Sequence, residues 1–171
     1  MKDLYLAGGS YYDLQEVFSR MPGIEAAVAG IASVKGGAEP AECVKVTYNP
    51  KLMDITSVLE MYFNVVDTYT PAAEPRLRSG IYYVYGEDAI QIEYYMRFFQ
   101  TRGCEPQAAL GNLIVNDSYD ARQQRPPLQT ELGRLASFTE APEEEQFYLR
   151  KHPQVKSAVN LEALAAAGLI K

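Results

Sequence analysis

Histidine, tryptophan and cysteine are scarce in this sequence of 171 residues, which has one His, no Trp and two Cys. Zinc sites take their ligands from clusters of His and Cys, so we expect no metal site, and nothing in the sequence indicates another cofactor. Two cysteines cannot build a disulfide framework. This favours a reducing cytoplasm over a secreted location.

Long hydrophobic runs and an excess of basic residues are also absent. No apolar run approaches the roughly 18 residues that a membrane helix needs, and the apolar stretch at the start is too short for a signal peptide. The 16 Lys and Arg are outnumbered by 22 Asp and Glu, so the net charge is -6, which argues against binding to nucleic acid phosphates. We expect a cytoplasmic protein that binds neither membranes nor nucleic acids.

The residues that are plentiful indicate a globular domain. Apolar residues make up 47% of the chain, enough to bury a core at this length, and 13 of them are Tyr. No repeat, low-complexity segment or linker divides the sequence. We therefore predict one domain over residues 1–171, with a core at about 3–153 and a helical C-terminal tail at 154–171.

Apolar spacing and turn residues predict the order of strands and helices. Ser10 and Asp54 stand where helix N-caps are expected. The first six elements have the order β-α-β-β-α-β, which is typical of an α+β two-layer sandwich with a ferredoxin-like core. The predicted strands are 4–7, 24–33, 42–48, 79–85 and 113–115. The first predicted helix follows Ser10 and ends at Pro22-Gly23, the second follows Asp54 and continues through Phe63, and the others span 86–101, 143–151 and 161–169. Residues 68–78 and 117–129 are predicted to be irregular.

The turn after the first strand is the best candidate site. Gly8-Gly9 allow a sharp turn, and Ser10 then lies at a helix N-terminus, where free N–H groups and the helix dipole favour an anion or a nucleophile. Tyr11 and Tyr12 would wall an apolar pocket. The alternative is that Ser10 serves only as an N-cap and that both tyrosines are packing residues.

Several other polar residues have both a functional and a structural interpretation. Glu42 heads a strand on the same face as two valines, where it is either half buried with a raised pKa suited to acid catalysis or an exposed strand end. Cys43 and Cys104 have no visible His or Arg cluster beside them, so inert thiols are expected. The acidic run 143–145 is predicted to be a solvated helix start, and His152 a surface residue at a helix end.

Four blocks of the sequence resemble the A-type peptide methionine sulfoxide reductases. Residues 6–12 (LAGGSYY) and 17–24 (VFSRMPGI) are similar to the family's A-G-G-C-F-W-G-x-E and F-x-R-x-P-G-V, in register without a gap. Residues 41–50 (AECVKVTYNP) resemble H-A-E-V-V-x-V-x-Y-D-P. Residues 59–67 with 78–83, and more weakly 142–153, resemble later family blocks. The resemblance covers roughly residues 4 to 160 and implies the family's ferredoxin-like fold.

The resemblance also implies a change in chemistry. In the family, a Cys thiolate at the helix N-terminus attacks the sulfoxide sulfur and becomes a sulfenic acid; methionine leaves, and a second thiol resolves the sulfenate as a disulfide. Here Ser10 stands at that nucleophile position. A hydroxyl is a weak nucleophile without an adjacent base, and its oxygen cannot take up the sulfoxide oxygen as sulfur does. The protein is therefore expected to lack the sulfur atom that takes up the sulfoxide oxygen in the family's redox cycle.

Other family positions differ as well, whereas Glu42 keeps the family's general-acid position. Tyr11-Tyr12 stand at the Phe-Trp that walls the family's methyl pocket, and the loop between Asp67 and Arg78 is shortened and has lost its Asp. At the remaining positions, this chain has Asp13 and Gln15 where the family has Gly and Glu, and Ile31 and Leu77 where the family has Tyr. It has Lys156-Ser157-Ala158 where the family has Tyr-Cys-His.

We therefore favour a diverged homologue of peptide-methionine (S)-S-oxide reductase without thiol-based activity. It would bind a methionine-sulfoxide-like small molecule, an oxidised peptide or a partner protein, with Ser10 and Glu42 at the catalytic positions and Tyr11 and Tyr12 as substrate-binding residues. One alternative is an enzyme of changed chemistry built on Ser10 and Glu42. Others are a reductase that uses Cys43 or Cys104, although strand neighbours face opposite ways, and a purely structural module. The sequence does not define the oligomeric state.

Overall fold

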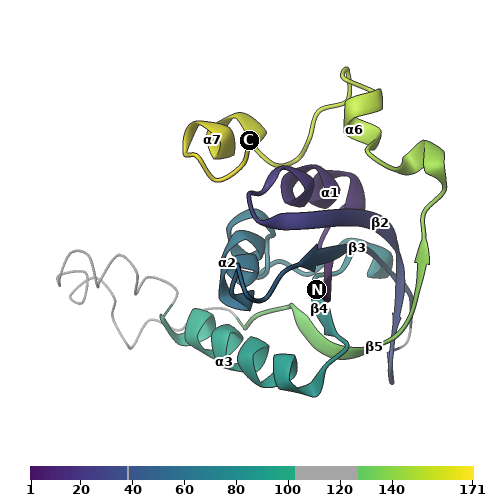
Figure 1. The fold of residues 1–171 in the computed structure, drawn as a ribbon. Helices are drawn as coiled ribbons and strands as arrows, with labels where there is room; N and C mark the ends of the chain where they lie inside the picture. Colours follow the sequence, from purple (N-terminus) through teal and green to yellow (C-terminus); the bar gives the residue numbers. More distant parts are fainter. Residues whose placement is uncertain (38, 103–126) are drawn as a thin grey trace.

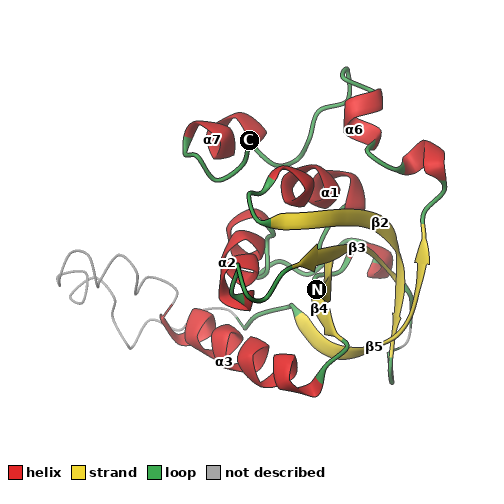
Figure 2. Ribbon diagram, viewed as in Figure 1, coloured by secondary structure: helices red, strands yellow, loops and turns green. Residues whose placement is uncertain are grey.

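The computed structural model describes residues 1–37, 39–102 and 127–171 (Figures 1 and 2). The first four strands and two α-helices follow the predicted order β-α-β-β-α-β, and the α+β class is confirmed. The elements are β1 (Lys2–Ala7), α1 (Tyr11–Arg20), β2 (Ile24–Val34), β3 (Ala41–Tyr48), α2 (Ile55–Val65), the 3-10 turn η1 (Pro75–Leu77), β4 (Gly80–Tyr83), α3 (Gly86–Arg102), β5 (Glu131–Glu140), the 3-10 turn η2 (Glu143–Glu145), α6 (Tyr148–Lys151) and α7 (Leu161–Ala166).

The five strands form a closed barrel in the order β1-β3-β2-β5-β4. β1 is antiparallel to β3 and β4, and β2 is antiparallel to β3 and β5. β5 closes the barrel because its other edge pairs in parallel with β4. The sheet is thus not the open layer of a two-layer sandwich, and the expected ferredoxin-like core is not confirmed as a description of the whole sheet.

Two cores follow from the alternation of side chains along the strands. Residues such as Leu4, Leu6 and Val44 point out of the barrel and pack against helices α1 and α2 in the larger core. Their neighbours point inward and form a smaller cluster, whose buried members are Tyr5, Ala7, Ala32, Ala41, Cys43 and Tyr82. Three of these six are alanines, which suits the narrow interior of a barrel with few strands.

The sequence does not predict strand β5, and for this reason it does not predict the closed barrel. Its apolar residues Leu132, Leu135 and Phe138 lie three apart, which matches no strand period, and none of its ten residues is fully buried. Its place in the sheet depends on pairing with β2, about a hundred residues earlier. Local sequence carries no signal for such a contact.

The helix predicted for 143–151 is also incorrect, because the segment is divided into η2 and α6. Phe147 has a left-handed backbone (φ 52°) between the two turns. Hydrogen bonds to α1 and β2 hold this break: the Phe147 N–H donates to Gln15 Oε1 at 2.7 Å, and the Gln146 amide bonds the backbone of Ala29. Tertiary contacts therefore override the helical pattern.

The C-terminal tail packs on α1 (Figure 1). Ile170 is only 4% exposed and belongs to the larger core. The Lys171 N–H donates to the Arg20 carbonyl at 2.9 Å, and Arg20 Nε donates back to the Lys171 carbonyl at 2.7 Å. α7 is shorter than the predicted 161–169. The predicted strand 113–115, most of 117–129 and Cys104 lie outside the described residues.

Candidate functional site

Ser10 forms the N-cap of α1, as predicted. The turn that precedes it places Gly9 at φ 73°, and the Gly9 N–H donates to the Leu77 carbonyl at 2.9 Å. Ser10 itself is extended (φ -73°, ψ 136°), and its Oγ accepts a hydrogen bond from the Tyr12 N–H at 3.1 Å. The hydroxyl oxygen thus satisfies one of the free N–H groups at the start of the helix.

Ser10 also lines a cavity of about 400 Å³. Its walls come from the β1–α1 turn, the end of α2 with the loop that follows it, and the C-terminal tail. Val65, Val66 and Leu77 supply much of the apolar wall, whereas Asp13 and Asp67 are the charged residues of the lining. Because the lining residues carry negative charge and no positive charge, the cavity suits a neutral or cationic group better than an anion.

The tail wall of this cavity is fixed to α1 by Asp13. Asp13 Oδ1 accepts hydrogen bonds from Ser157 Oγ at 2.6 Å and from the Ala158 N–H at 3.2 Å. Ala158 and Val159, which follow Ser157, also line the cavity. The short segment before α7 is therefore the part of the tail that contributes to the wall of the cavity.

Glu42 also contacts the α1 N-terminus but is not part of the cavity lining, and it is buried, with 7% of its surface exposed. Its Oε1 accepts the Tyr11 N–H at 3.3 Å, and its Oε2 accepts the guanidinium of Arg76 from η1. Burial raises the pKa of Glu42, while the Tyr11 N–H and Arg76 act in the opposite direction and Glu145 adds to the rise. Of the two sequence interpretations, the buried carboxyl group is confirmed.

Tyr11 and Tyr12 hold one carboxylate between them. Each hydroxyl donates to a different oxygen of Glu145 in η2, at 3.0 Å in both cases. The Tyr12 ring also stacks on Tyr148 with 4.2 Å between centroids, and Tyr148 stacks on His152 at 4.0 Å. Burial, with the Glu145 hydrogen bond second, raises the pKa of Tyr12 to about 12 and raises that of Tyr11 as well. Both phenols therefore stay protonated at neutral pH.

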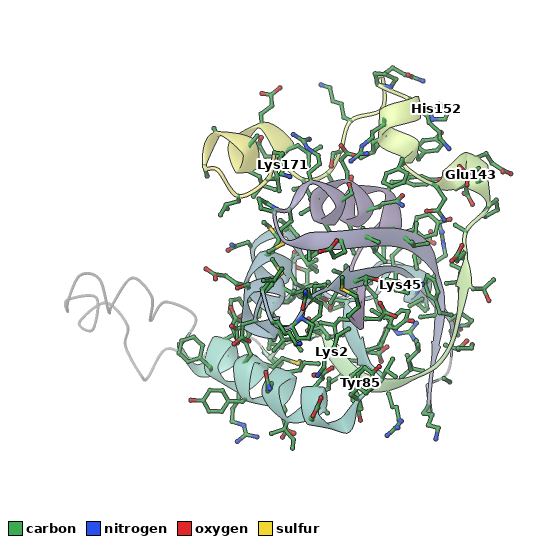
Figure 3. The ribbon with its side chains drawn as sticks, in the orientation of Figure 1. Lys2, Lys45, Tyr85, Glu143, His152 and Lys171 are labelled. Atoms are coloured by element: carbon green, nitrogen blue, oxygen red, sulfur yellow. The ribbon has the colours of Figure 1, made fainter. Side chains whose placement is uncertain are left out.

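The four residues singled out from the sequence thus meet around the first turn of α1 but face different surroundings. Ser10 lines the cavity, whereas Tyr11, Tyr12 and Glu42 are not part of its lining and have their polar groups occupied by Glu145 and Arg76. Figure 3 shows Glu143 and His152 on the segment that passes the outer side of α1, which brings η2 to the tyrosines.

Two residues of this arrangement were missed by sequence reasoning. The sequence predicts that Glu145 belongs to a solvated acidic run and that Arg76 lies in an irregular loop without a role. The segment 74–77 has Pro at its centre and one cation between apolar neighbours, a pattern that is ordinary for a surface turn. Only the fold brings either side chain to the α1 N-terminus, so no local signal could have identified them.

The described cysteine is not suited to thiol chemistry. Cys43 points into the barrel and has no exposed surface, and burial strongly raises the pKa of its thiol. A thiolate is therefore disfavoured, and a substrate cannot reach it. Within the part of the chain that the structure describes, no group of three or more His, Cys, Asp or Glu is arranged to hold a metal ion.

The family model for peptide methionine sulfoxide reductase matches residues 2–121, more than half of the chain. The chain belongs to the peptide methionine sulfoxide reductase family. It is 25% identical over 177 residues to the peptide methionine sulfoxide reductase MsrA of Ureaplasma urealyticum, with 94% of each chain covered. The protein of the same name from Clostridium botulinum is 24% identical over 169 residues, covering 90% of this chain and 94% of that one.

Solved structures of this family share the fold. Mxr1 from Saccharomyces cerevisiae in reduced form matches with a TM-score of 0.69 at 19% identity, covering 91% of this chain and 89% of that chain. Methionine sulfoxide reductase A of Corynebacterium diphtheriae matches with a TM-score of 0.64 at 19% identity, covering 92% and 77%. Among residues 1–37, 39–102 and 127–171, no helix has the length and apolar character needed to cross a bilayer.

Proposed function

We propose that this chain is a reductase-family member without the thiol redox cycle, which binds a methionine-sulfoxide-like ligand at the N-terminus of α1. The observation that carries the proposal is Ser10: it caps α1 and lines the cavity at the point where the family resemblance puts the nucleophile. We also interpret the antiparallel order β4-β1-β3-β2 as a ferredoxin-like core to which β5 has been added.

Sulfur chemistry explains why Ser10 does not replace a thiolate. Reduction of a sulfoxide removes one oxygen and needs two electrons, which in a thiol enzyme come from sulfur through the sulfenic acid and then a disulfide. A serine hydroxyl has no oxidation state of this kind. Cys43 cannot supply the electrons either, because it is enclosed by the barrel. The described site therefore has no group that can supply the two electrons.

The cavity fits the apolar part of such a ligand. Its volume of about 400 Å³ and its Val and Leu walls suit a thioether or methyl sulfoxide side chain. Asp13 and Asp67 would oppose a free carboxylate on the ligand, which favours a blocked or peptide-bound residue. The buried free thiol of Cys43 agrees with the reducing, cytoplasmic setting that we infer from the cysteine content.

A reductase assay tests the loss of chemistry. We expect the purified protein with N-acetyl-methionine sulfoxide methylamide and dithiothreitol to release no N-acetyl-methionine methylamide above the rate without protein. Turnover that disappears on Cys43→Ala or Cys104→Ala would show an active reductase with an unusual thiol. An esterase-like activity that disappears on Ser10→Ala would instead show changed chemistry at the hydroxyl.

A binding titration tests the remaining part of the proposal. Calorimetry with the same sulfoxide should show saturable binding, and Ala72→Phe, which fills the cavity from its loop wall, should weaken it about tenfold or more. Ala166→Phe on the exposed side of α7 is the matched control and should bind like the wild type. Equal binding by Ala72→Phe would place the ligand elsewhere, and no binding by any variant would remove the proposed function.

A further inference from the structure

A second cavity, of about 370 Å³, is lined by the start of α3 and by the turn that joins β3 to α2. It shares no lining residue with the cavity at Ser10, and the proposed function does not use it. Lys2 of β1 also belongs to the lining and lies beside the first turn of α3 (Figure 3). The volume is in the range of pockets that bind small molecules.

The hydroxyl of Tyr48 points to a ligand in this cavity. Tyr48 is 1% exposed and lines the cavity, and its hydroxyl makes no hydrogen bond to any residue that the structure describes. Among these residues, Tyr69 carries the only enclosed side-chain oxygen or nitrogen without a partner, so the Tyr48 hydroxyl is not sealed in the core. The charges that act most on it, Asp88 and Lys2, line the same cavity. The hydroxyl therefore opens into the cavity with its hydrogen-bonding capacity unused.

Two donors of the lining are available to a carboxylate. Burial raises the pKa of Tyr48 to about 12, and Asp88 adds to the rise, so the phenol keeps its proton at neutral pH and donates. Lys51 is exposed, lines the cavity and forms no ion pair within the described part of the chain. A hydroxyl and an unpaired ammonium group are donors that a carboxylate accepts in short, strong hydrogen bonds.

Two carboxylates of the same lining keep an oxygen for a cation. Asp88 is 2% exposed; its Oδ1 accepts from Lys2 at 2.8 Å, and its Oδ2 has no partner among the described residues. Asp54 uses Oδ1 to accept the Thr56 N–H at 3.0 Å, which leaves its Oδ2. Lys2 is already shared between Asp88 and Glu87, at 2.6 Å from the latter. These free oxygens therefore suit an ammonium group on a ligand.

The lining also has an apolar part. Ile55 is buried, with 5% of its surface exposed, and Met53 packs partly buried against the larger core. Leu52 is 80% exposed at the same cavity, so a ligand with an apolar group would remove its surface from water. The cavity thus combines apolar residues with two lysines and two aspartates, whose charges balance.

We propose that this cavity binds a zwitterionic α-amino acid with an apolar side chain. The carboxylate of the ligand accepts from Tyr48 and Lys51, its ammonium group donates to Asp54 and Asp88, and its side chain covers the apolar residues. A purely anionic or purely cationic ligand would leave one pair of these groups without a partner, at a cost in free energy. The inference is independent of the proposed function, which concerns the other cavity.

Calorimetry with matched ligands tests the charge pattern. L-Leucine should bind saturably, whereas N-acetyl-L-leucine, which lacks the ammonium group, and L-leucinamide, which lacks the carboxylate, should each bind at least about tenfold more weakly. Glycine should also bind more weakly than leucine, because it has no side chain to cover the apolar residues. No saturable binding of leucine, or equal binding of either blocked ligand, overturns the inference.

Tyr48→Phe removes the donor and keeps the ring. It should weaken leucine binding about tenfold, the value of one ordinary hydrogen bond, and leave Tm unchanged because the hydroxyl has no partner among the described residues. Tyr94→Phe makes the same change on a side chain of α3 that is 72% exposed, and this matched control should alter neither quantity. Unchanged leucine binding, or a large loss of Tm, in Tyr48→Phe overturns the inference.

Two exposed positions test the two ends of the ligand without touching the core. Lys51→Ala should weaken binding of leucine but not of leucinamide, and Lys35→Ala, at another exposed lysine, is its control. Asp54→Asn keeps a residue that caps α2 and should weaken binding of leucine but not of N-acetyl-leucine. Leucine binding that neither variant changes contradicts the assignment.

The location of the ligand is tested with the variant that fills the other cavity. Ala72→Phe should bind leucine like the wild type, because Ala72 lines only the cavity at Ser10. Loss of leucine binding in Ala72→Phe places the amino acid in that cavity and overturns the inference. If no variant binds the sulfoxide while leucine binds as expected, the proposed function fails and the amino acid site stands.

Discussion

Gln146 provides the sharpest test of how the site is held together. Its side-chain amide makes four hydrogen bonds and is 8% exposed. Oε1 accepts from the Ala29 N–H at 3.1 Å and from Gln15 Nε2 at 2.8 Å; Nε2 donates to the carbonyls of Ala29 at 2.9 Å and Ala141 at 3.0 Å. We predict that Gln146→Ala destabilises the protein by about 3 kcal/mol.

The magnitude follows from the groups that lose their partners. The Ala29 carbonyl keeps a bond from the Ala141 N–H at 2.9 Å, and Gln15 Nε2 keeps its bond to the Ala27 carbonyl. The Ala141 carbonyl is only partly buried and can bond water, whereas the Ala29 N–H and one Gln15 N–H have no such replacement. Each unpaired buried group costs about 1–3 kcal/mol, so two at the middle of this range, partly rehydrated, give about 3 kcal/mol. A chain of this length then loses about 6–12 °C in Tm.

Urea unfolding followed by circular dichroism measures the loss. Gln91→Ala on the exposed face of α3 is the matched control and should change stability by less than about 0.5 kcal/mol. The variant should also loosen η2, so the Tyr12 hydroxyl loses its fixed contact with Glu145 and its ring its stack on Tyr148. A loss below about 1 kcal/mol for Gln146→Ala would refute the reasoning, since the amide would then not be holding these backbone groups.

Three further predictions concern the tail, the thiol and the acid. Ile170→Ala should cost about 2–4 kcal/mol by urea unfolding because Ile170 is 4% exposed, whereas Ile90→Ala, at a position 72% exposed, should cost almost nothing; equal losses would show that the tail is not part of the core. In a variant without the other cysteine, Cys43 should react with a thiol reagent at pH 8 only after unfolding in guanidinium chloride, and rapid labelling of the folded protein would contradict its burial. Burial raises the folded pKa of Glu42 above its unfolded value, so the folded state binds this proton more tightly and stability falls as the pH rises between the two values; unfolding of Glu42→Gln should lack this loss, and parallel curves for both proteins would contradict it.

The local features of the site were predictable because each depends on a few neighbouring residues. Ser10 after two glycines and Asp54 before an apolar stripe were identified as N-caps, and both side chains accept hydrogen bonds from the helix backbone. Alternation placed Glu42 on the same strand face as Val44 and Val46 but left open whether it is buried or an exposed strand end, and the structure shows that it is buried. Each cap forms a hydrogen bond to a backbone N–H two residues further along the chain, and the face of Glu42 follows from the two-residue period of a strand.

The environment of these residues was not predictable in the same way. Arg76 reaches Glu42 across 34 positions, and Glu145 reaches the hydroxyls of Tyr11 and Tyr12 across more than 130. Nothing in the local composition of either segment distinguishes these side chains from ordinary surface charges. Their partners are set by how the turn η1 and the segment after β5 pass the first turn of α1.

By itself, the sequence determined the family, the α+β class and the residue types at the start of α1, because family motifs, helix caps and apolar periods are local patterns. Only the tertiary structure decided that β5 closes a barrel, that Cys43 is enclosed by it, and that Glu42 is already paired. The physical reason is the same for all three. Burial, strand pairing and ion pairing join segments far apart in the chain, and their free energies exist only once those segments are packed together.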